Sequence, residues 1–244
     1  MRFGRRAIPC DGMPRTARIV IPGLSYHVTQ RGNNGQDVFL QEEDRRAYLR
    51  LLAKYARRFR LEVRGWCLMT NHLHLIVMPW SDTSLARALG VISQLHAQRM
   101  NTLHGRKGHL WQDRFYSCAM DESHAVAAMR YVEQNPVRAK LTNLAWTYAW
   151  SSAAAHVGGD DPWGLLDLDT WRKDWSAKDW RRMLKAGLDD VSVQAIRRTT
   201  SRGRPQGSED FVSKVESLLG RRVRPLPVGR QRGWRKGGHA SRNK

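Results

Sequence analysis

The chain has 244 residues, which is enough for one domain with a sizeable core plus appendages, or for two small domains. Lysine and arginine total 42 against 22 acidic residues, so the formal net charge is +20, and a polyanion such as nucleic acid is the partner that best explains the excess. No apolar stretch approaches the roughly 20 residues that a membrane-spanning helix needs, so we expect no membrane partner.

The cysteines and the first residues indicate a cytoplasmic protein. Cys10, Cys67 and Cys118 are widely spaced and odd in number, a pattern that gives neither a disulfide framework nor a zinc-binding spacing. The first 20 residues lack the apolar core of a secretory signal. We therefore expect the protein to remain in a reducing cytoplasm.

The first half of the chain alternates between strand and helix patterns. Residues 19–30 are rich in Val, Ile, Thr and Tyr and end in a turn-forming cluster, which predicts a strand followed by a loop. Residues 42–59 repeat apolar side chains at helical spacing, with acids first and bases last, as in a helix that packs on a sheet. Residues 61–78 predict either two strands separated by Thr70-Asn71 or one long bent strand.

A second pair of elements follows Pro79. A helix is predicted over residues 84–103, with Asp82 or Ser84 as its N-cap and an apolar stripe that includes His96. Residues 108–120 predict a loop and a short strand, after which Asp121 opens a helix that runs up to Pro136. Residues 137–157, helical or irregular, are expected to pack back on the core.

The composition changes near residue 158, where we place a domain edge. Short helices are predicted at residues 176–188 and 189–198, then a linker over 199–208 and a helix over 209–220. Residues 197–244 hold 14 Lys or Arg and three acidic residues, a net +11. This part of the chain should strengthen DNA binding in a salt-dependent way.

The chemistry-bearing residues lie on one predicted strand and one predicted helix. His72 and His74 are two residues apart, so on a strand they project from the same face and can form a metal-binding pair; the alternative is a pair of hydrogen-bonded core residues. Tyr131 and Asn135 are four apart, so one helical face can present a phenol nucleophile and an amide ligand. Gln134 is a less aligned alternative ligand. Tyr116 is the competing nucleophile, which we expect to pack in the core.

Seven polar residues are candidates for DNA contact. Gln112 and Arg114 face DNA if Trp111 and Phe115 anchor their loop, whereas the alternative places the whole segment in the core. The RGRP sequence that begins at Arg202 resembles an extended minor-groove hook, with a flexible basic linker as the alternative. The predicted DNA-binding residues are Arg15, Arg18, Arg31, Gln112, Arg114, Arg202 and Arg204.

Four sequence blocks carry a family resemblance. In chain order they are IPGLSYHVTQRGNN, CLMTNHLHLIVMP, LWQDRFYS and RYVEQNPVRAKL. Together they resemble the REP-associated tyrosine transposases, which are single-tyrosine HUH transposases, over residues 15 to about 157. Many members have proline before the Asn-His step, where this chain has Thr70, a small difference in how the chain enters the strand.

The resemblance implies a fold and a reaction. The fold is α+β, a compact antiparallel sheet flanked by helices, to which this chain adds a mainly helical basic C-terminal extension. The reaction is Mg²⁺- or Mn²⁺-dependent cleavage and strand transfer of single-stranded DNA that forms palindromic hairpins. Tyr131 would form a 5′-phosphotyrosine intermediate, and His72, His74 and Asn135 would hold the metal. The alternative function is a catalytically silent regulator that binds hairpin DNA.

The resemblance also divides the chain and suggests its setting. We expect a flexible segment at residues 1–14, the catalytic domain at 15–157, a helical extension at 158–200, and a basic DNA-binding linker, helix and tail at 201–244. We expect a monomer that completes its own site, with a dimer as the alternative, in association with the bacterial nucleoid.

Overall fold

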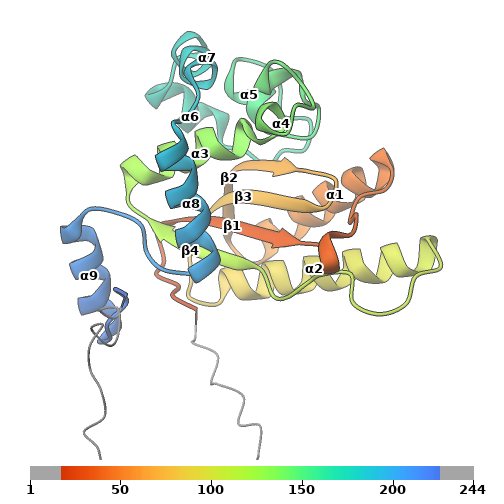
Figure 1. Cartoon of the computed structure of the whole chain (residues 1–244), viewed down its shortest axis with the longest axis horizontal. Helices are drawn as coiled ribbons and strands as arrows, with labels where there is room; N and C mark the ends of the chain where they lie inside the picture. The colour runs from red at the N-terminus through yellow and green to blue at the C-terminus, as the bar shows by residue number, and fades with distance from the viewer. Residues whose placement is uncertain (1–17, 226–244) are drawn as a thin grey trace, which may run out of the picture.

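A four-stranded antiparallel sheet organises the chain, with the strand order β2-β3-β1-β4 (Figure 1). The computed structural model describes residues 18–225, so Arg15, the segment 1–14 and the end of the basic tail lie outside the described residues. The strands are β1 Ser25–Arg31, β2 Leu61–Leu68, β3 His72–Pro79 and β4 Tyr116–Met120. The α+β class expected from the sequence is confirmed.

Helices flank the sheet within residues 18–225. Those before β4 are α1 Glu42–Arg58 and α2 Ser84–Leu103. Those after β4 are α3 Glu122–Glu133, α4 Asn135–Arg138, α5 Ala153–His156, α6 Leu168–Asp174, α7 Ala177–Ala186, α8 Asp190–Arg202 and α9 Glu209–Leu219. Short 3-10 turns occupy Asn33–Gly35 and Ala145–Thr147. None of the described helices is long and apolar enough to cross a membrane.

The strand pattern separates two hydrophobic cores. Val28 and Leu75 pair across β1 and β3 and face α1 and α2, whose apolar side chains complete the first core. Ile76 and Cys118 project from the opposite face, where they pack with residues of α3, α7 and α8. Helices therefore cover both faces of the sheet. Each fully buried Leu, Ile or Val side chain in these cores contributes about 1.5–3 kcal/mol to the stability of the fold.

The structure corrects three of the boundaries predicted from the sequence. Residues 61–78 form two strands, so the alternative of one bent strand is wrong. The strand predicted from residue 19 begins only at Ser25. The expected cap of α2 by Asp82 or Ser84 is also wrong, because the N-cap residue is Thr83 without a side-chain cap. The Ser84 hydroxyl instead accepts a hydrogen bond from the Ser81 amide at 3.0 Å.

The helix that carries Tyr131 lies very close to β2. Its N-cap is Asp121, whose carboxylate accepts from the His124 amide at 2.9 Å, as the sequence predicts. Gly65 stands at a register shift in β2, and a Cβ there would lie 2.2 Å from the sulfur of Met129. Glycine at this position lets the Met129 side chain of α3 pack directly against the strand backbone.

Two predicted segments differ from the structure. The helix expected to run to Pro136 is divided, since α3 ends at Glu133 and α4 begins at Asn135 with Pro136 in its first turn. The linker expected over 199–208 is wrong in its first part, because α8 continues to Arg202 and ends at Gly203 in the left-handed conformation, with φ of 62°. The helix expected over 209–220 is present as α9, to one side of the sheet (Figure 1).

Candidate active site

Three histidines and Tyr131 gather on the sheet face that α3 and α8 cover. The ring centroids of His72 and His74 are 5.0 Å apart. The Tyr131 ring lies edge-on to His74 at 5.5 Å and to His27 at 5.7 Å. The structure therefore brings the tyrosine predicted from one helix beside the histidine pair predicted from one strand. We call His27, His72, His74 and Tyr131 the histidine cluster.

A hydrogen bond to Asn71 fixes the tautomer of His72. The amide nitrogen of Asn71 donates to the Gly35 carbonyl at 3.2 Å, so the amide oxygen faces His72 Nδ1, 2.7 Å away. Because that oxygen can only accept, Nδ1 of His72 carries the proton and Nε2 keeps its lone pair. Asn71, a turn residue in the sequence, therefore orients a predicted ligand.

A second chain of hydrogen bonds orients His74. Nδ1 of His74 lies 2.9 Å from Nε2 of His27, and Nδ1 of His27 lies 2.8 Å from the Thr200 hydroxyl. Sequence reasoning missed both partners. The sequence places His27 on a strand, but its proximity to His74 follows only from the pairing of β1 with β3. Thr200 belongs to α8, 173 residues from His27.

The histidines are neutral near pH 7 in this environment. Burial lowers the pKa of His27 to about 3, with a further contribution from Arg138. Burial, followed by Arg31 and Arg197, lowers the pKa of His72 to about 4. Burial, then His27 and the surrounding charges, holds the pKa of His74 well below its usual value. A neutral imidazole is the form that binds a metal ion.

The free ring nitrogens fit a divalent metal. Nε2 of His72 and Nε2 of His74 make no hydrogen bond with residues 18–225, and neither is sealed from solvent. In that part of the chain, no group of three or more His, Cys, Asp or Glu side chains is arranged to hold a metal. The pair therefore supplies two ligands, and amide, water or phosphate oxygens must complete the sphere.

The two candidate amide ligands differ in their availability. Gln134 is buried and donates to the Leu184 carbonyl, so its amide is already engaged. Asn135 is also buried, but its Nδ2 has no hydrogen-bond partner within the described residues. In the same part of the chain, Asn135 makes no hydrogen bond or ring contact to either histidine of the pair. Of the two candidate ligands, Asn135 is therefore the one whose amide nitrogen is not engaged by the described residues.

Arginines and α8 surround the Tyr131 side chain. Tyr131 is 4% exposed. Nε of Arg197, on α8, donates to its phenol oxygen at 3.3 Å, and the Arg138 guanidinium lies 4.1 Å from the ring centroid. Tyr116, expected to pack in the core, is 39% exposed on β4, so that prediction is wrong. The phenol beside the histidines is the buried one.

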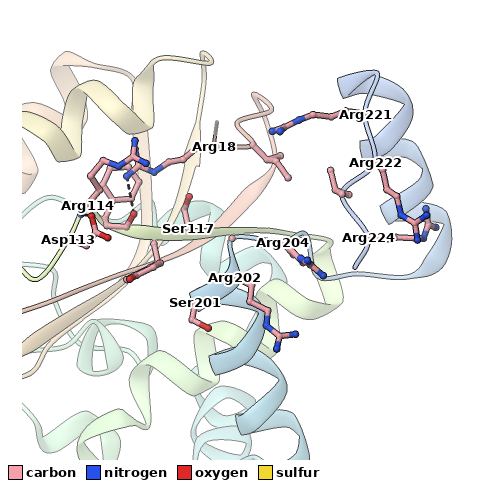
Figure 2. Close-up of a pocket in the computed structure, with 15 residues that line it drawn as sticks. Arg18, Asp113, Arg114, Ser117, Ser201, Arg202, Arg204, Arg221, Arg222 and Arg224 are labelled. Atoms are coloured by element: carbon pink, nitrogen blue, oxygen red, sulfur yellow. Dashed lines mark hydrogen bonds between the residues drawn. The ribbon is translucent and has the colours of Figure 1, made fainter. Parts of the chain in front are cut away.

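The predicted DNA-binding residues fall into two groups. Arg31 is exposed and pairs with His72 in the β1–β3 register, and its carbonyl accepts from the Gln112 amide at 2.9 Å. Trp111 anchors this loop through its indole bond to the Ser93 carbonyl, while Gln112 is exposed. The second group lines a cleft to which no residue of the histidine cluster contributes: Arg18, Arg114, Arg202 and Arg204 (Figure 2).

Comparisons with known proteins match the first part of the chain to one family. Residues 20–135 match the sequence model of a family described as "Transposase IS200 like". Among solved structures, a REP-associated tyrosine transposase bound to a REP hairpin is similar at 19% identity and a TM-score of 0.49, over 64% of this chain and 90% of that one. A candidate transposase from Deinococcus radiodurans is similar at 19% identity and a TM-score of 0.34, over 55% and 97% of the two chains. No curated protein matches the sequence.

Proposed function

We propose that the chain is a transposase of the IS200-like family, whose sequence model matches residues 20–135. In this proposal it is a metal-dependent enzyme that cuts and rejoins single-stranded DNA carrying palindromic hairpins. One observation carries the proposal: the Tyr131 ring lies 5.5 Å from the ring of His74, beside a histidine pair with free Nε2 atoms. The net charge of +20 suits a DNA substrate.

His72, His74 and Asn135 would hold Mg²⁺ or Mn²⁺. When bound, such an ion withdraws negative charge from the non-bridging oxygens of the scissile phosphate. The chain supplies the orientation. Asn71 holds His72, and the His27 ring, itself bonded to Thr200, holds His74. Partners of this kind fix the direction of each lone pair.

Tyr131 is the proposed nucleophile. Its phenol oxygen attacks phosphorus, so an O–P bond to Tyr131 forms as the bond to the 3′ oxygen breaks. The products are a 5′-phosphotyrosine and a free 3′-hydroxyl, and the proton that the phenol loses balances the one that the 3′ oxygen gains. Arg197 donates to the phenol oxygen in this structure and so places a positive charge beside the attacking atom.

A covalent-adduct assay tests this reaction. The protein is incubated with end-labelled hairpin DNA that has single-stranded flanks and with Mg²⁺ or Mn²⁺, and the adduct is resolved on a denaturing gel. We expect an adduct that EDTA abolishes and that Tyr131→Phe does not form. Tyr55→Phe is the matched control, because this tyrosine lies on α1, on the other face of the sheet. An adduct of equal yield with Tyr131→Phe would remove the assigned nucleophile.

One observation favours a second candidate function. The phenol of Tyr131 is buried beneath α8, at 4% exposure, as it would be in a protein that keeps the scaffold for binding alone. Such a protein would be a hairpin-DNA-binding regulator without cleavage activity. Tight hairpin binding with no adduct in either metal would favour this function over the enzyme.

A further inference from the structure

A cleft of about 530 Å³ lies at the outer edge of β4, between the sheet and the C-terminal helices (Figure 2). Seven arginines and one acidic residue, Asp113, are among the residues that line it. The arginines come from four separate segments of the chain. They are Arg18 before β1, Arg114 before β4, Arg202 and Arg204 at the end of α8 and just after it, and three residues that follow α9.

These arginines divide into structural and available ones. Arg224 is committed, because it pairs with Glu209 at 3.0 Å and with Glu216. Arg18 donates to the Phe115 carbonyl at 3.0 Å and lies 3.7 Å from the centre of that ring. By contrast, the side chains of Arg202 and Arg204 make no ion pair or hydrogen bond within residues 18–225. Uncompensated guanidinium groups in a cleft attract phosphate.

The segment that presents Arg202 and Arg204 is held against the sheet. Gly203 turns the chain out of α8, and the Cys118 thiol donates to the Arg204 carbonyl at 2.9 Å. The next contact is strand-like, since the Gln206 amide donates to the Ala119 carbonyl at 2.8 Å. Neither alternative from the sequence fits: the RGRP segment is not an extended hook, and it is not a free linker.

An exposed aromatic ring lies among these charges. Tyr116 lines the cleft and is 39% exposed, whereas its neighbour Phe115 is 6% exposed. Basic side chains that follow a backbone, together with an open aromatic face, are the combination that binds single-stranded nucleic acid, because an unpaired base can stack on the ring. The bases of a duplex are already stacked and offer no free face.

We propose that this arginine cleft binds a single-stranded DNA segment, with phosphates on Arg114, Arg202 and Arg204 and a base on Tyr116. The inference rests on the proposed function and gives it a substrate path. Thr200 of α8 bonds to His27, and Arg202 opens the cleft two residues later, so one helix end connects the two sites. Arg202 and Arg204 lie outside the part of the chain that matches the transposase family.

Equilibrium binding to the Tyr131→Phe protein, which forms no adduct under the proposed function, tests the cleft. Fluorescence anisotropy is measured with a short labelled oligothymidylate and with a blunt duplex of two complementary strands, over a series of salt concentrations. We expect Arg202→Gln with Arg204→Gln to weaken oligothymidylate binding about tenfold or more and to reduce the salt slope by about 1.4, roughly 0.7 for each phosphate that the variant no longer neutralises.

Two further variants test the contribution of the Tyr116 ring. Tyr116→Leu should weaken oligothymidylate binding about fivefold or more, and Tyr116→Phe, which keeps the ring, should restore it. The matched charge control is Arg57→Gln with Arg58→Gln, on the exposed end of α1 near the far edge of the sheet. It removes the same two charges and should change binding by less than about twofold.

Three outcomes would overturn the cleft. They are equal losses in the cleft and control variants, unchanged oligothymidylate binding in the cleft variants, and an equal loss for the blunt duplex, which would indicate duplex binding. The proposed reaction fails separately. If no adduct forms but the cleft variants still lose oligothymidylate binding, the cleft stands without the enzyme. If the adduct forms and binding is unchanged, the enzyme stands without the cleft.

Discussion

Two buried polar clusters lie on the same face of the sheet, and α3 contributes to both. The histidine cluster contains Tyr131. Two residues later on the same helix, Glu133 is the centre of what we call the carboxylate cluster, with Ser152, His156 and Trp180. The Glu133 carboxylate accepts from the Ser152 hydroxyl at 2.6 Å, from His156 at 2.5 Å and from the Trp180 indole at 2.8 Å.

The clusters differ in whether all of their polar atoms have hydrogen-bond partners in the protein. In the carboxylate cluster both carboxylate oxygens have protein donors, and the four residues are at most 2% exposed. In the histidine cluster, Nε2 of His72 and of His74 have no partner within the described residues, although the opposite ring nitrogens are bonded. A saturated buried network fixes structure. A network that leaves two ring nitrogens without a protein partner is suited to an external ligand.

The largest expected effect is on the stability that Glu133 provides. Glu133→Ala should lower the free energy of unfolding by about 3 to 5 kcal/mol, because it leaves the buried His156 and Trp180 donors without an acceptor. Urea unfolding followed by circular dichroism measures this. The control is His72→Gln in the histidine cluster, which removes no saturated network and should cost less than about 1 kcal/mol. Similar losses in the two variants would remove the distinction between the clusters.

The next effect sharpens the same contrast by changing the support of a metal ligand. Asn71→Ala removes the acceptor that fixes the His72 tautomer, so Mn²⁺ binding should weaken about ten- to a hundredfold while unfolding changes little. Calorimetric titration with Mn²⁺ measures the affinity.

The control for Asn71 is an asparagine with a similar local bond. The Asn101 amide donates to the Gly108 carbonyl at 3.1 Å, distant in sequence from both histidines. Asn101→Ala should leave Mn²⁺ affinity unchanged. Unchanged affinity in Asn71→Ala as well would contradict the role that we assign to its amide oxygen.

Sequence patterns predicted the elements that local rules determine. Apolar spacing placed α1 and α2 within a residue of their observed ends, and strand alternation placed His72 and His74 on one face. Two strands separated by Thr70-Asn71 were one of the two alternatives for residues 61–78, and Asp121 was expected to open the helix that it caps. Each of these depends on residues a few positions apart, so no knowledge of the tertiary structure was needed.

The support around the site depends on contacts that no short pattern contains. His27 approaches His74 through strand pairing, and Thr200 reaches His27 because α8 returns to the sheet. Glu133 finds Trp180 only when α7 packs on α3. Tyr116 was expected to pack because of its apolar neighbours, yet β4 is an edge strand and leaves it exposed. The helical extension at residues 158–200 thus supplies Thr200 to a site whose histidines and Tyr131 belong to the preceding part of the chain.

The smallest effect concerns His96, a histidine on the opposite face of the sheet. It tests whether burial alone gives a histidine the metal-binding property that we propose for the histidine cluster. Nε2 of His96 lies 2.8 Å from the Val38 carbonyl, and Nδ1 is sealed without a partner among the described residues, unlike the open nitrogens of His72 and His74. Burial lowers the pKa of His96 to about 4, against weaker raising effects of Val38 and Asp44. We therefore expect a structural histidine that affects stability and not metal binding.

The direction of its pH effect follows from that pKa. Below about pH 6.5 the unfolded chain binds a proton at His96 that the folded chain refuses until about pH 4, so this contribution to stability is complete above pH 6.5 and is lost as the pH falls. At about pH 5.5 the loss is on the order of 1 kcal/mol. His96→Gln can still donate to the Val38 carbonyl but does not titrate, so urea unfolding at pH 7 and pH 5.5 should show a smaller decrease in the variant. An equal decrease in both proteins would mean that His96 already takes up its proton in the folded state near pH 5.5. The assignment of a pKa lowered by burial would then be wrong.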